Sequence, residues 1–297
     1  MSFLRETGVI AAAVTPWADD GSVDLNRFDD QIRWIAEQRP LAISVASVEV
    51  QEYHLLDSEQ RIALVERAVA AAGGIPVIGG VTTPTPRTSV VLAERMAGIG
   101  ASAVLALAGP KPWAAPQTGD EMVTWFGSLA DGSPVPVLCY SNPRTGSEPS
   151  VSALADICQH ENIGAIKETS RDMVKVLGLC KQIGIDGSAG VYINMETLMA
   201  TVLLGGQGAM VPAPGLPASL RILDALRDGD LDLARHWQLF FTDFPSRWMR
   251  LGLGPAVKAA LAAIGVNVGG SPEPYASLTT EEQDEIRALF QQWELVR

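Results

Sequence analysis

The chain has 297 residues, of which 47% are hydrophobic, and it carries a formal net charge of −12. This acidity argues against binding to nucleic acid or to an anionic membrane surface through bulk electrostatics. No stretch reaches the roughly 18 uninterrupted apolar residues that a membrane-spanning helix needs, and the apolar run before Pro16 is too short for a secretory signal. Three cysteines without CxxC or metal-ligand spacing indicate free thiols in a reducing compartment. We therefore expect a soluble cytoplasmic protein with no membrane or nucleic-acid partner.

Short apolar runs alternate with longer amphipathic stretches along most of the chain. The runs predict strands at 8–15, 41–48, 75–81, 101–107, 135–140, 163–167, 183–189 and 207–211. The stretches between them, with apolar residues three and four apart, predict helices at 25–38, 57–72, 86–99, 119–130, 150–160, 171–182 and 194–204. Asp24 can cap the first helix, and Asp57 and Gln60 have the spacing of a capping box before the second. This alternation predicts a parallel (β/α)8 TIM barrel, because the competing doubly wound sheets usually stop at about five or six strands.

After Pro212 the alternation ends and the pattern is helical, with helices predicted at 217–228, 231–250, 254–264 and 279–295. We expect residues 1–225 to form the catalytic barrel and residues 226–297 a C-terminal helical extension packed on it. One segment of this extension is rich in large apolar side chains, namely Trp237, Phe240, Phe241, Trp248 and Met249. The cluster indicates a homo-oligomer, either a dimer or a tetramer, unless it packs against the wall of the barrel.

The stretch IGAIKETS at 163–170 places one lysine at the end of an apolar strand. In α/β barrels the loops after the strands form the active face, so Lys167 is expected there. Partial burial lowers the pKa of a lysine, and a neutral amine can attack a carbonyl group to form a Schiff base. The alternative is a surface lysine paired with Glu168.

Two other strand-end residues are candidates for chemistry or binding. Tyr140 can carry protons beside a cationic amine, although its hydroxyl could equally be satisfied by backbone. Arg144, in a Pro-Arg-Thr-Gly turn, offers a planar fork for a carboxylate, although most single arginines lie at the surface. A metal site is poorly supported, because the three histidines lie far apart in the sequence.

Several segments together resemble the dihydrodipicolinate synthase / N-acetylneuraminate lyase family of class I aldolase-type barrels. The N-terminal GVIAAAVTPWADDGSVDLNRF is similar to the family's first strand, Thr-Pro turn and first helix, and IPVIGGV at 75–81 to its third strand. YSNPRTG at 140–146 resembles its Tyr-Asn-x-Pro…Arg-Thr-Gly loop, IGAIKETS its Schiff-base strand, and GPAVKAAL at 254–261 its C-terminal helix. The resemblance covers nearly the whole chain. It implies a barrel with extra C-terminal helices in which Lys167 forms the Schiff base.

The departures from the family pattern concern the substrate. The family's Gly-Thr-Thr-Gly-Glu loop, whose threonines hold the 2-oxo acid carboxylate and relay protons, is replaced by VEVQE at 48–52. Only Glu52 is retained in that register, and a one-residue shift brings Ser47 close. The tyrosine that a neighbouring subunit contributes in the synthases is missing at 110–112. Tyr140 fits the catalytic tyrosine with a one-residue gap, whereas Cys139 takes that position without the gap.

We therefore predict a Schiff-base-forming lyase that acts on a 2-oxo acid, with Lys167 and Tyr140 as catalytic residues. The predicted substrate-binding residues, all on loops after strands, are Arg144, Ser47, Glu49 and Glu52. No metal or cofactor is expected, because the iminium itself withdraws electrons. The altered loop predicts a reaction other than lysine-pathway dihydrodipicolinate synthesis.

Two alternatives remain. One is a keto-deoxy sugar acid dehydratase, since EYH at 52–54 resembles the Glu-Phe-Phe stretch of that branch of the family. The other is a non-catalytic barrel of the same family that binds a small molecule.

Overall fold

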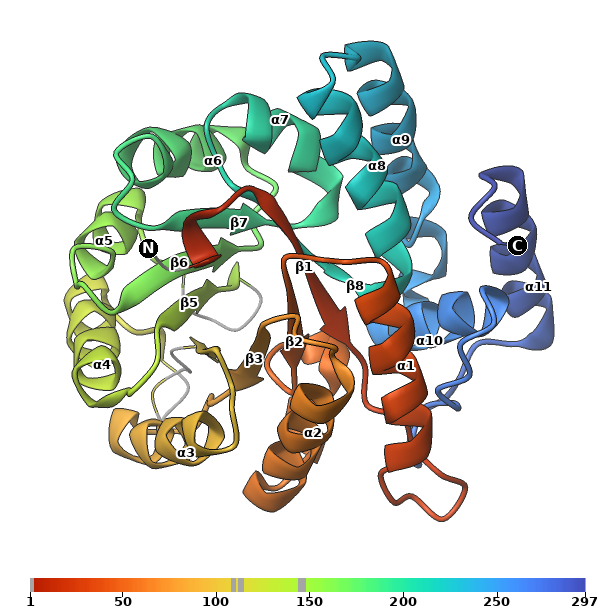
Figure 1. Ribbon diagram of the computed structural model, residues 1–297, viewed down its shortest axis with the longest axis horizontal. Helices are drawn as coiled ribbons and strands as arrows, with labels where there is room; N and C mark the ends of the chain where they lie inside the picture. The colour runs from red at the N-terminus through yellow and green to blue at the C-terminus, as the bar shows by residue number, and fades with distance from the viewer. Residues whose placement is uncertain (1–2, 108–110, 112–114, 144–147, 297) are drawn as a thin grey trace.

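The computed structural model describes residues 3–107, 111, 115–143 and 148–296. Eight parallel strands hydrogen-bond in chain order, and the last pairs with the first to close a barrel. Helices surround this barrel on the outside (Figure 1). The predicted (β/α)8 barrel is confirmed, and the open doubly wound sheet is excluded.

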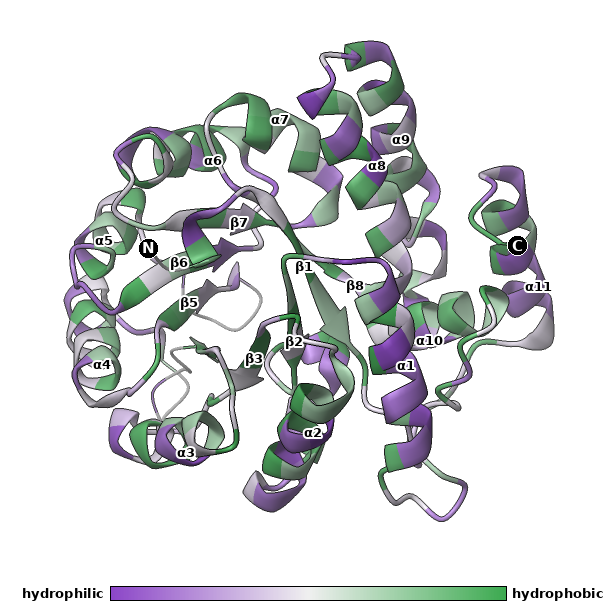
Figure 2. Cartoon of the chain, in the orientation of Figure 1, coloured by the Kyte–Doolittle hydropathy of each residue, from purple (hydrophilic) through white to green (hydrophobic). Residues whose placement is uncertain are grey.

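The strands of the barrel are short and buried on both faces. Their bounds are β1 (Gly8–Ala13), β2 (Ala42–Val45), β3 (Val77–Gly80), β4 (Ala103–Leu107), β5 (Val137–Ser141), β6 (Ile163–Glu168), β7 (Gly190–Ile193) and β8 (Gly208–Pro212). Small and branched apolar residues dominate, because inward side chains fill the barrel while outward side chains meet the helices. Figure 2 shows green and pale strands surrounded by helices on which purple and green residues alternate.

The barrel helices are amphipathic, and several of them begin after a residue whose side chain caps the first turn. Their bounds are α1 (Leu25–Glu37), α2 (Ser58–Ala71), α3 (Pro86–Gly98), α4 (Gly119–Gly132), α5 (Val151–Ile157), α6 (Met173–Leu179), α7 (Leu198–Leu203) and α8 (Leu216–Arg227). Asp24 caps α1, and Asp57 and Gln60 form the predicted capping box of α2. No helix in the described part of the chain is long and apolar enough to cross a membrane.

The amino-terminal segment fills the end of the barrel at which the strands begin. The short helix η1 (Phe3–Arg5) buries Leu4 there, and the Tyr192 hydroxyl donates a hydrogen bond to the Glu6 carbonyl over 2.7 Å. A Cβ atom at Gly190 would lie only 1.9 Å from the Leu4 carbonyl oxygen, so this close approach requires glycine. In Figure 1 the segment is red and lies beside β6 and β7. The opposite end of the barrel, where the strands finish, remains for the site.

The seventh strand lies at Gly190–Ile193 and not at 183–189, where the sequence predicted it. Residues Cys180–Gly184 instead continue α6 as a π-helical turn, η5, in which Ile183 is wholly buried. A short apolar run fits a buried helix as well as a strand, and periodicity alone does not separate them. The correction moves the loop after β7 to Asn194 and its successors.

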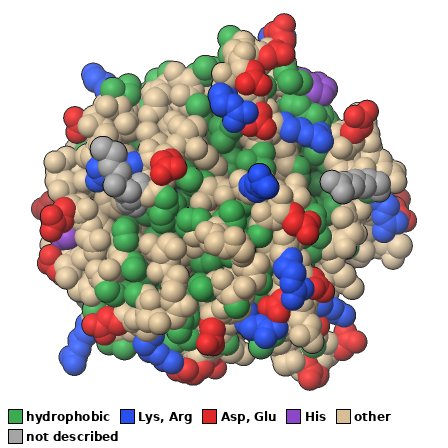
Figure 3. Space-filling model, in the orientation of Figure 1, with side chains coloured by type: hydrophobic (Ala, Val, Ile, Leu, Met, Phe, Trp, Pro, Cys, Tyr) green, Lys and Arg blue, Asp and Glu red, His purple; other side chains and the backbone are tan. Residues whose placement is uncertain are grey.

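Three further helices follow the barrel: α9 (Leu231–Asp243), α10 (Leu253–Ala263) and α11 (Thr280–Gln292). The single helix predicted at 231–250 is interrupted at Phe244-Pro245, and the 3-10 segment η8 (Ser246–Leu251) follows. Proline has no N–H group to continue a helix and restricts the residue before it, which accounts for the break. In Figure 3 acidic and basic side chains are interspersed over the visible face of the molecule, with no large patch of one sign.

The aromatic cluster that was predicted to mark a subunit interface is largely buried inside the chain. The rings of Phe240 and Phe244 stack with their centroids 5.7 Å apart, and Phe290 of α11 meets Phe240 edge-on at 5.4 Å. Phe241 and Trp248 are also buried. The cluster therefore holds the C-terminal helices together and does not support an oligomer. The division of the chain at residues 225 and 226 remains a prediction.

Candidate active site

Lys167 and Tyr140 lie side by side at the carboxyl ends of β6 and β5. They are register partners in the parallel ladder, so their side chains point to the same side of the sheet, into the barrel. The Lys167 Nζ atom lies 5.2 Å from the centre of the Tyr140 ring. Both residues line one cavity, although only 5% of Lys167 is exposed. The two predicted catalytic residues are thus brought together by backbone pairing.

Burial is the main influence on the Lys167 amine. It lowers the pKa of Lys167 from the ordinary 10.5 to about 8, because an ammonium ion loses hydration inside the barrel. The carboxylates of Glu49, Glu168 and Glu196 act in the opposite direction, while Arg171 lowers the pKa further. At pH 7, one unit below this pKa, about a tenth of the amine is therefore uncharged, far more than at an ordinary lysine.

Glu49 is the nearest acidic partner of Tyr140 in the cavity. The Tyr140 hydroxyl donates a hydrogen bond of 2.7 Å to Glu49 Oε2. The Asn142 Nδ2 group donates to Glu49 Oε1 over 3.1 Å and to the Tyr140 hydroxyl oxygen over 2.9 Å. Burial, followed by the charge of Glu49, raises the pKa of Tyr140 above its ordinary value. The phenol is therefore neutral and hydrogen-bonded to a carboxylate.

Two residues adjacent to the pair in sequence face away from the cavity. The Glu168 carboxylate accepts hydrogen bonds from the Ser141 hydroxyl (2.8 Å) and the Ser170 N–H (2.7 Å), and forms an ion pair with Lys175 at 3.0 Å. Cys139 is wholly buried, and burial raises the pKa of its thiol. The structure therefore places Tyr140, and not Cys139, beside the lysine, and it does not pair Lys167 with Glu168.

The loop that carries Glu49 is built around the buried amide of Gln51. Gln51 Oε1 accepts hydrogen bonds from the N–H groups of Ser47 (2.8 Å) and Val48 (3.0 Å) and from the Ser47 hydroxyl (2.8 Å). Its Nε2 group donates to the carbonyls of Ala13 and Ser44. This amide fixes the 3-10 turn η2 (Glu49–Gln51) to β1 and β2. Ser47, a predicted substrate-binding residue, is buried beneath the loop and does not line the cavity.

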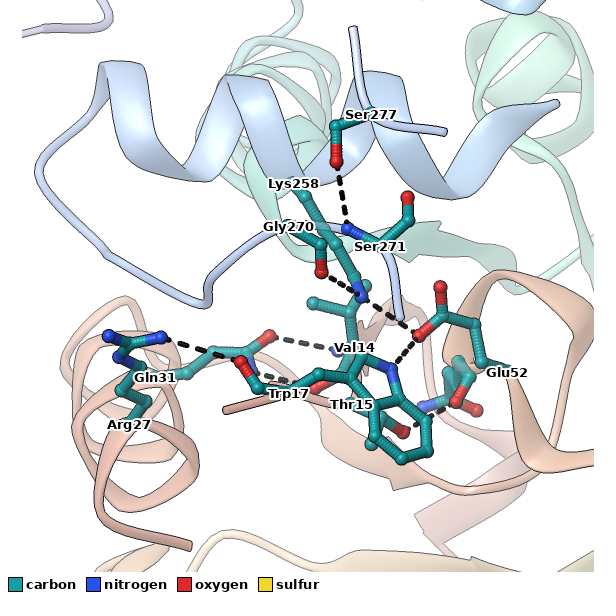
Figure 4. A network of polar contacts seen from close by, with 11 residues as sticks. Val14, Thr15, Trp17, Arg27, Gln31, Glu52, Lys258, Gly270, Ser271 and Ser277 are labelled. Carbon is teal, nitrogen blue, oxygen red and sulfur yellow. Dashed lines mark hydrogen bonds and ion pairs between the residues drawn. The ribbon is translucent and has the colours of Figure 1, made fainter. Parts of the chain in front are cut away.

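Glu52 lies in a second buried network and is not among the residues that line the cavity. Its Oε2 atom accepts hydrogen bonds from Trp17 Nε1 at 2.6 Å and from Lys258 Nζ at 2.9 Å. Lys258 also donates to the Gly270 carbonyl over 3.0 Å. Figure 4 shows Lys258 reaching from α10 to both acceptors, with the indole of Trp17 beside Glu52. Glu52 thus attaches α10 to the loop after β2, and its predicted role in substrate binding stays a prediction.

The cavity over Lys167 has a volume of about 570 Å³, within the range of small-molecule sites. The polar and charged lining residues that were not predicted include Asn142, Glu148, Thr169, Ser170, Arg171, Asn194 and Glu196. The C-terminal part of the chain adds a wall that was also missed, with Pro245, Ser246, Met249 and Leu253. Arg144, the predicted carboxylate-binding residue, lies outside the described residues.

Titratable groups gathered in one cavity at the carboxyl ends of eight parallel strands are the arrangement of a (β/α)8-barrel enzyme. Comparison with known proteins narrows this class. The chain matches the Dihydrodipicolinate synthetase family over residues 5–293, and it belongs to that family. The members are lyases of the class I aldolase type, so the expected enzyme class is confirmed.

Curated relatives align with almost the whole chain. The 4-hydroxy-tetrahydrodipicolinate synthase of Exiguobacterium sp. (strain AT1b) is 25% identical over 296 residues, which are 98% of this chain and 99% of that protein. The synthase of Enterococcus faecalis is 28% identical over 289 residues, with 95% and 97% covered. A crystal structure of YagE, a prophage protein of the same family from E. coli K12 in complex with pyruvate, has a TM-score of 0.87 at 22% identity, with 97% and 99% covered.

Proposed function

We propose that the chain is a Schiff-base lyase that acts on a 2-oxo acid through Lys167. The supporting observation is the buried amine of Lys167, with a pKa of about 8, which faces the cavity beside Tyr140. A neutral amine attacks the ketone carbon, and the carbinolamine loses water to give an iminium. Tyr140 transfers protons in these steps. The bond to the distal part of the substrate then breaks, and the iminium accepts the electron pair of that bond.

Two features support binding of the substrate carboxylate near Lys167. The first turn of a helix leaves backbone N–H groups without partners inside the helix, and η2 begins with Glu49 and Val50 at the cavity wall. Arg144 follows β5 in the sequence, and we retain it as a proposed partner of the same carboxylate.

We further propose a substrate with a hydroxylated part beyond the oxo acid, and a reaction other than the condensation of the lysine pathway. The carboxylates of Glu49, Glu148 and Glu196 line the cavity and can accept hydrogen bonds from hydroxyl groups. A volume of about 570 Å³ leaves room well beyond a three-carbon acid. The pyruvate bound by YagE is consistent with a 2-oxo acid as the shared reacting part.

Borohydride trapping tests the covalent step. The protein is incubated with a panel of 2-oxo acids, namely pyruvate and several keto-deoxy sugar acids, then reduced and analysed by intact mass and peptide mapping. We expect a reduced adduct on Lys167, with more labelling by the sugar acids than by pyruvate. Lys167→Met should abolish labelling, whereas Lys181→Met, at an exposed lysine, should retain it. Adducts that persist in Lys167→Met would contradict the assignment.

A keto-deoxy sugar acid dehydratase is the second candidate, because the same three carboxylates suit a hydroxylated acid and the same iminium activates the neighbouring carbon for loss of water. Product analysis separates the two reactions. Cleavage of a keto-deoxy sugar acid yields pyruvate and an aldehyde, whereas dehydration retains the carbon chain in one product. Nuclear magnetic resonance of the reaction mixture distinguishes these outcomes directly.

A further inference from the structure

Glu49 forms a hydrogen bond with Tyr140 that the binding of substrate hydroxyl groups does not explain. Its carboxylate lies in the cavity wall and accepts the only proton of the Tyr140 hydroxyl, over 2.7 Å. With that proton directed at Glu49, the phenol oxygen can act toward the cavity only as a hydrogen-bond acceptor. A carboxylate that accepts a hydrogen bond from a phenol is positioned to receive a proton through that phenol.

We propose that Glu49 is the terminal proton acceptor of a two-step relay, in which a proton of the bound substrate passes to Tyr140 as the Tyr140 proton passes to Glu49. The inference rests on the proposed function, because it requires a substrate held as an imine on Lys167. It assigns Glu49 to catalysis in addition to the binding of hydroxyl groups.

Asn142 keeps this relay in alignment. Its Nδ2 group donates both to Glu49 Oε1 (3.1 Å) and to the Tyr140 oxygen (2.9 Å), so one amide bridges the two members. Asn142 is itself buried, with 6% of its surface exposed. It acts as a positioning residue, because an amide neither gives up nor takes up a proton at neutral pH.

A lone phenol would not serve as the base. Burial and the neighbouring charge raise the pKa of Tyr140, so its phenolate is scarce at neutral pH. A concerted transfer avoids the phenolate, because Tyr140 loses one proton as it gains another. The negative charge that disappears is that of Glu49, which is replaced by a neutral carboxylic acid.

The bonds and charges of the cleavage balance in this scheme. A hydroxyl two carbons from the iminium carbon gives its proton to Tyr140, and Tyr140 gives its own to Glu49. The bond between the hydroxyl-bearing carbon and the carbon next to the iminium breaks. Its electron pair neutralises the iminium as an enamine, and the hydroxyl-bearing part leaves as an aldehyde. Glu49 then returns the proton through Tyr140 to the enamine carbon. Water hydrolyses the regenerated iminium, which frees the 2-oxo acid and Lys167.

The return step can be measured with pyruvate as the probe, without knowledge of the natural aldehyde. Pyruvate bound as an imine exchanges its methyl hydrogens for deuterium in D2O only if a base removes a hydrogen, exchanges it with the solvent and delivers deuterium to the enamine carbon. The exchange is followed by nuclear magnetic resonance at millimolar pyruvate, and borohydride trapping of Lys167 is measured in parallel. Trapping reports imine formation, whereas exchange reports the relay.

We expect Glu49→Gln, which keeps the hydrogen bond from Tyr140 but cannot take up its proton, to slow exchange by about 10²- to 10⁴-fold, the usual contribution of a positioned base. Trapping should persist, and its pH dependence should move to lower pH, because Glu49 normally raises the pKa of Lys167. Glu49→Asp should restore part of the exchange. Circular dichroism confirms that each variant is folded.

Glu196→Gln is the matched control. Glu196 is a carboxylate of the same cavity that also raises the pKa of Lys167 but has no hydrogen bond with Tyr140. The trapping profile should shift in the same direction, and exchange should slow far less than in Glu49→Gln.

Three outcomes would overturn the relay. Exchange in Glu49→Gln within threefold of the wild-type rate would show that Glu49 does not take the proton. Loss of trapping in folded Glu49→Gln would assign Glu49 to imine formation instead. Absence of trapping in the wild-type protein would overturn the proposed function, and the relay with it.

Discussion

The pKa of Lys167 connects the chemistry of the site to the stability of the fold. In the folded chain it is about 8, below the ordinary 10.5, so the native state releases this proton before the unfolded chain does. Below about pH 8 both states carry the charge, and its burial destabilises the native state in full. Between about pH 8 and 10.5 the unfolded state binds more protons, so stability rises with pH, and above that window the penalty is absent.

Lys167→Met should therefore stabilise the protein most at neutral pH. Methionine retains the apolar stem and removes the charge, and the gain at about pH 7 should reach about 3 kcal/mol, from roughly 1.4 kcal/mol for each pH unit of depression. The difference between variant and wild type in urea unfolding, measured at several pH values, should shrink as pH rises through the window. A difference that is constant with pH would show that packing, and not charge, is responsible.

Sequence reasoning found the residues whose roles follow from strand ends and missed those that depend on contact. Lys167 and Tyr140 were predicted because each ends an apolar run, and parallel pairing then made them neighbours. Ser47 and Glu52 were assigned to the substrate from the resemblance of their loop to the family's Gly-Thr-Thr-Gly-Glu segment. In the structure Ser47 donates to the buried amide of Gln51, and Glu52 binds Lys258. No local pattern predicts the second partner, which lies 206 residues away.

At the scale of elements, the ion pair between Glu52 and Lys258 fixes α10 to the loop after β2. Only 3% of the Lys258 side chain and 13% of the Glu52 side chain are exposed. Removal of one member leaves the other charge buried without its partner, which costs about 3–5 kcal/mol. We expect this loss in both Lys258→Met and Glu52→Gln, measured as a lower urea midpoint.

The double variant Lys258→Met/Glu52→Gln should recover much of the loss, because a neutral amide still accepts the hydrogen bond from Trp17 and no unpaired charge remains. If the double variant is as unstable as the sum of the single variants, the two side chains are not coupled.

The seventh strand shows that an apolar run alone does not distinguish a strand from a buried helical turn. Ile183 and Ile185 gave the run at 183–189 an apolar appearance, yet the chain there extends α6 and then turns at Gly187, whose φ is +75°. The true strand was interpreted as a loop, and Asn194 and Glu196, which follow it, were missed for that reason. An error in one boundary therefore removed two residues from the predicted site.

At the scale of the whole molecule, an exposed apolar stripe replaces the buried aromatic cluster as the basis for expecting a homo-oligomer. Val174 (77% exposed) and Leu177 (46%) lie on α6, and Ile185 (69%) directly follows its π-helical continuation. Exposed contiguous apolar surface often marks an interface. We expect light scattering at micromolar concentration to give a mass above the 31.5 kDa of one chain.

Val174→Lys combined with Leu177→Glu should lower that mass without unfolding the chain, because both side chains face outward. The same pair of charges on α9, Leu231→Lys with Leu233→Glu, is the control and should leave the mass unchanged. A monomeric mass for the wild-type protein would contradict the expectation.

The barrel could be predicted from the alternation of strand and helix patterns, which is a property of the local sequence. The shape of the cavity could not be predicted in this way. Its outer wall comes from Pro245, Ser246, Met249 and Leu253, in a segment whose pattern indicates only helix. That segment reaches the active face because Phe244-Pro245 interrupts the helix and redirects the chain. Long-range packing of this kind has no signature in periodicity.

The wall follows Lys167 in the chain, and this order has a consequence for the stage of synthesis at which the lysine is activated. A ribosome delivers Lys167 and the barrel strands before it delivers the wall at 245–253. We expect the amine to be more exposed to solvent until then, and a solvated amine stays charged and poorly nucleophilic. The segment that completes the cavity is therefore also the one that we expect to complete the activation of the lysine.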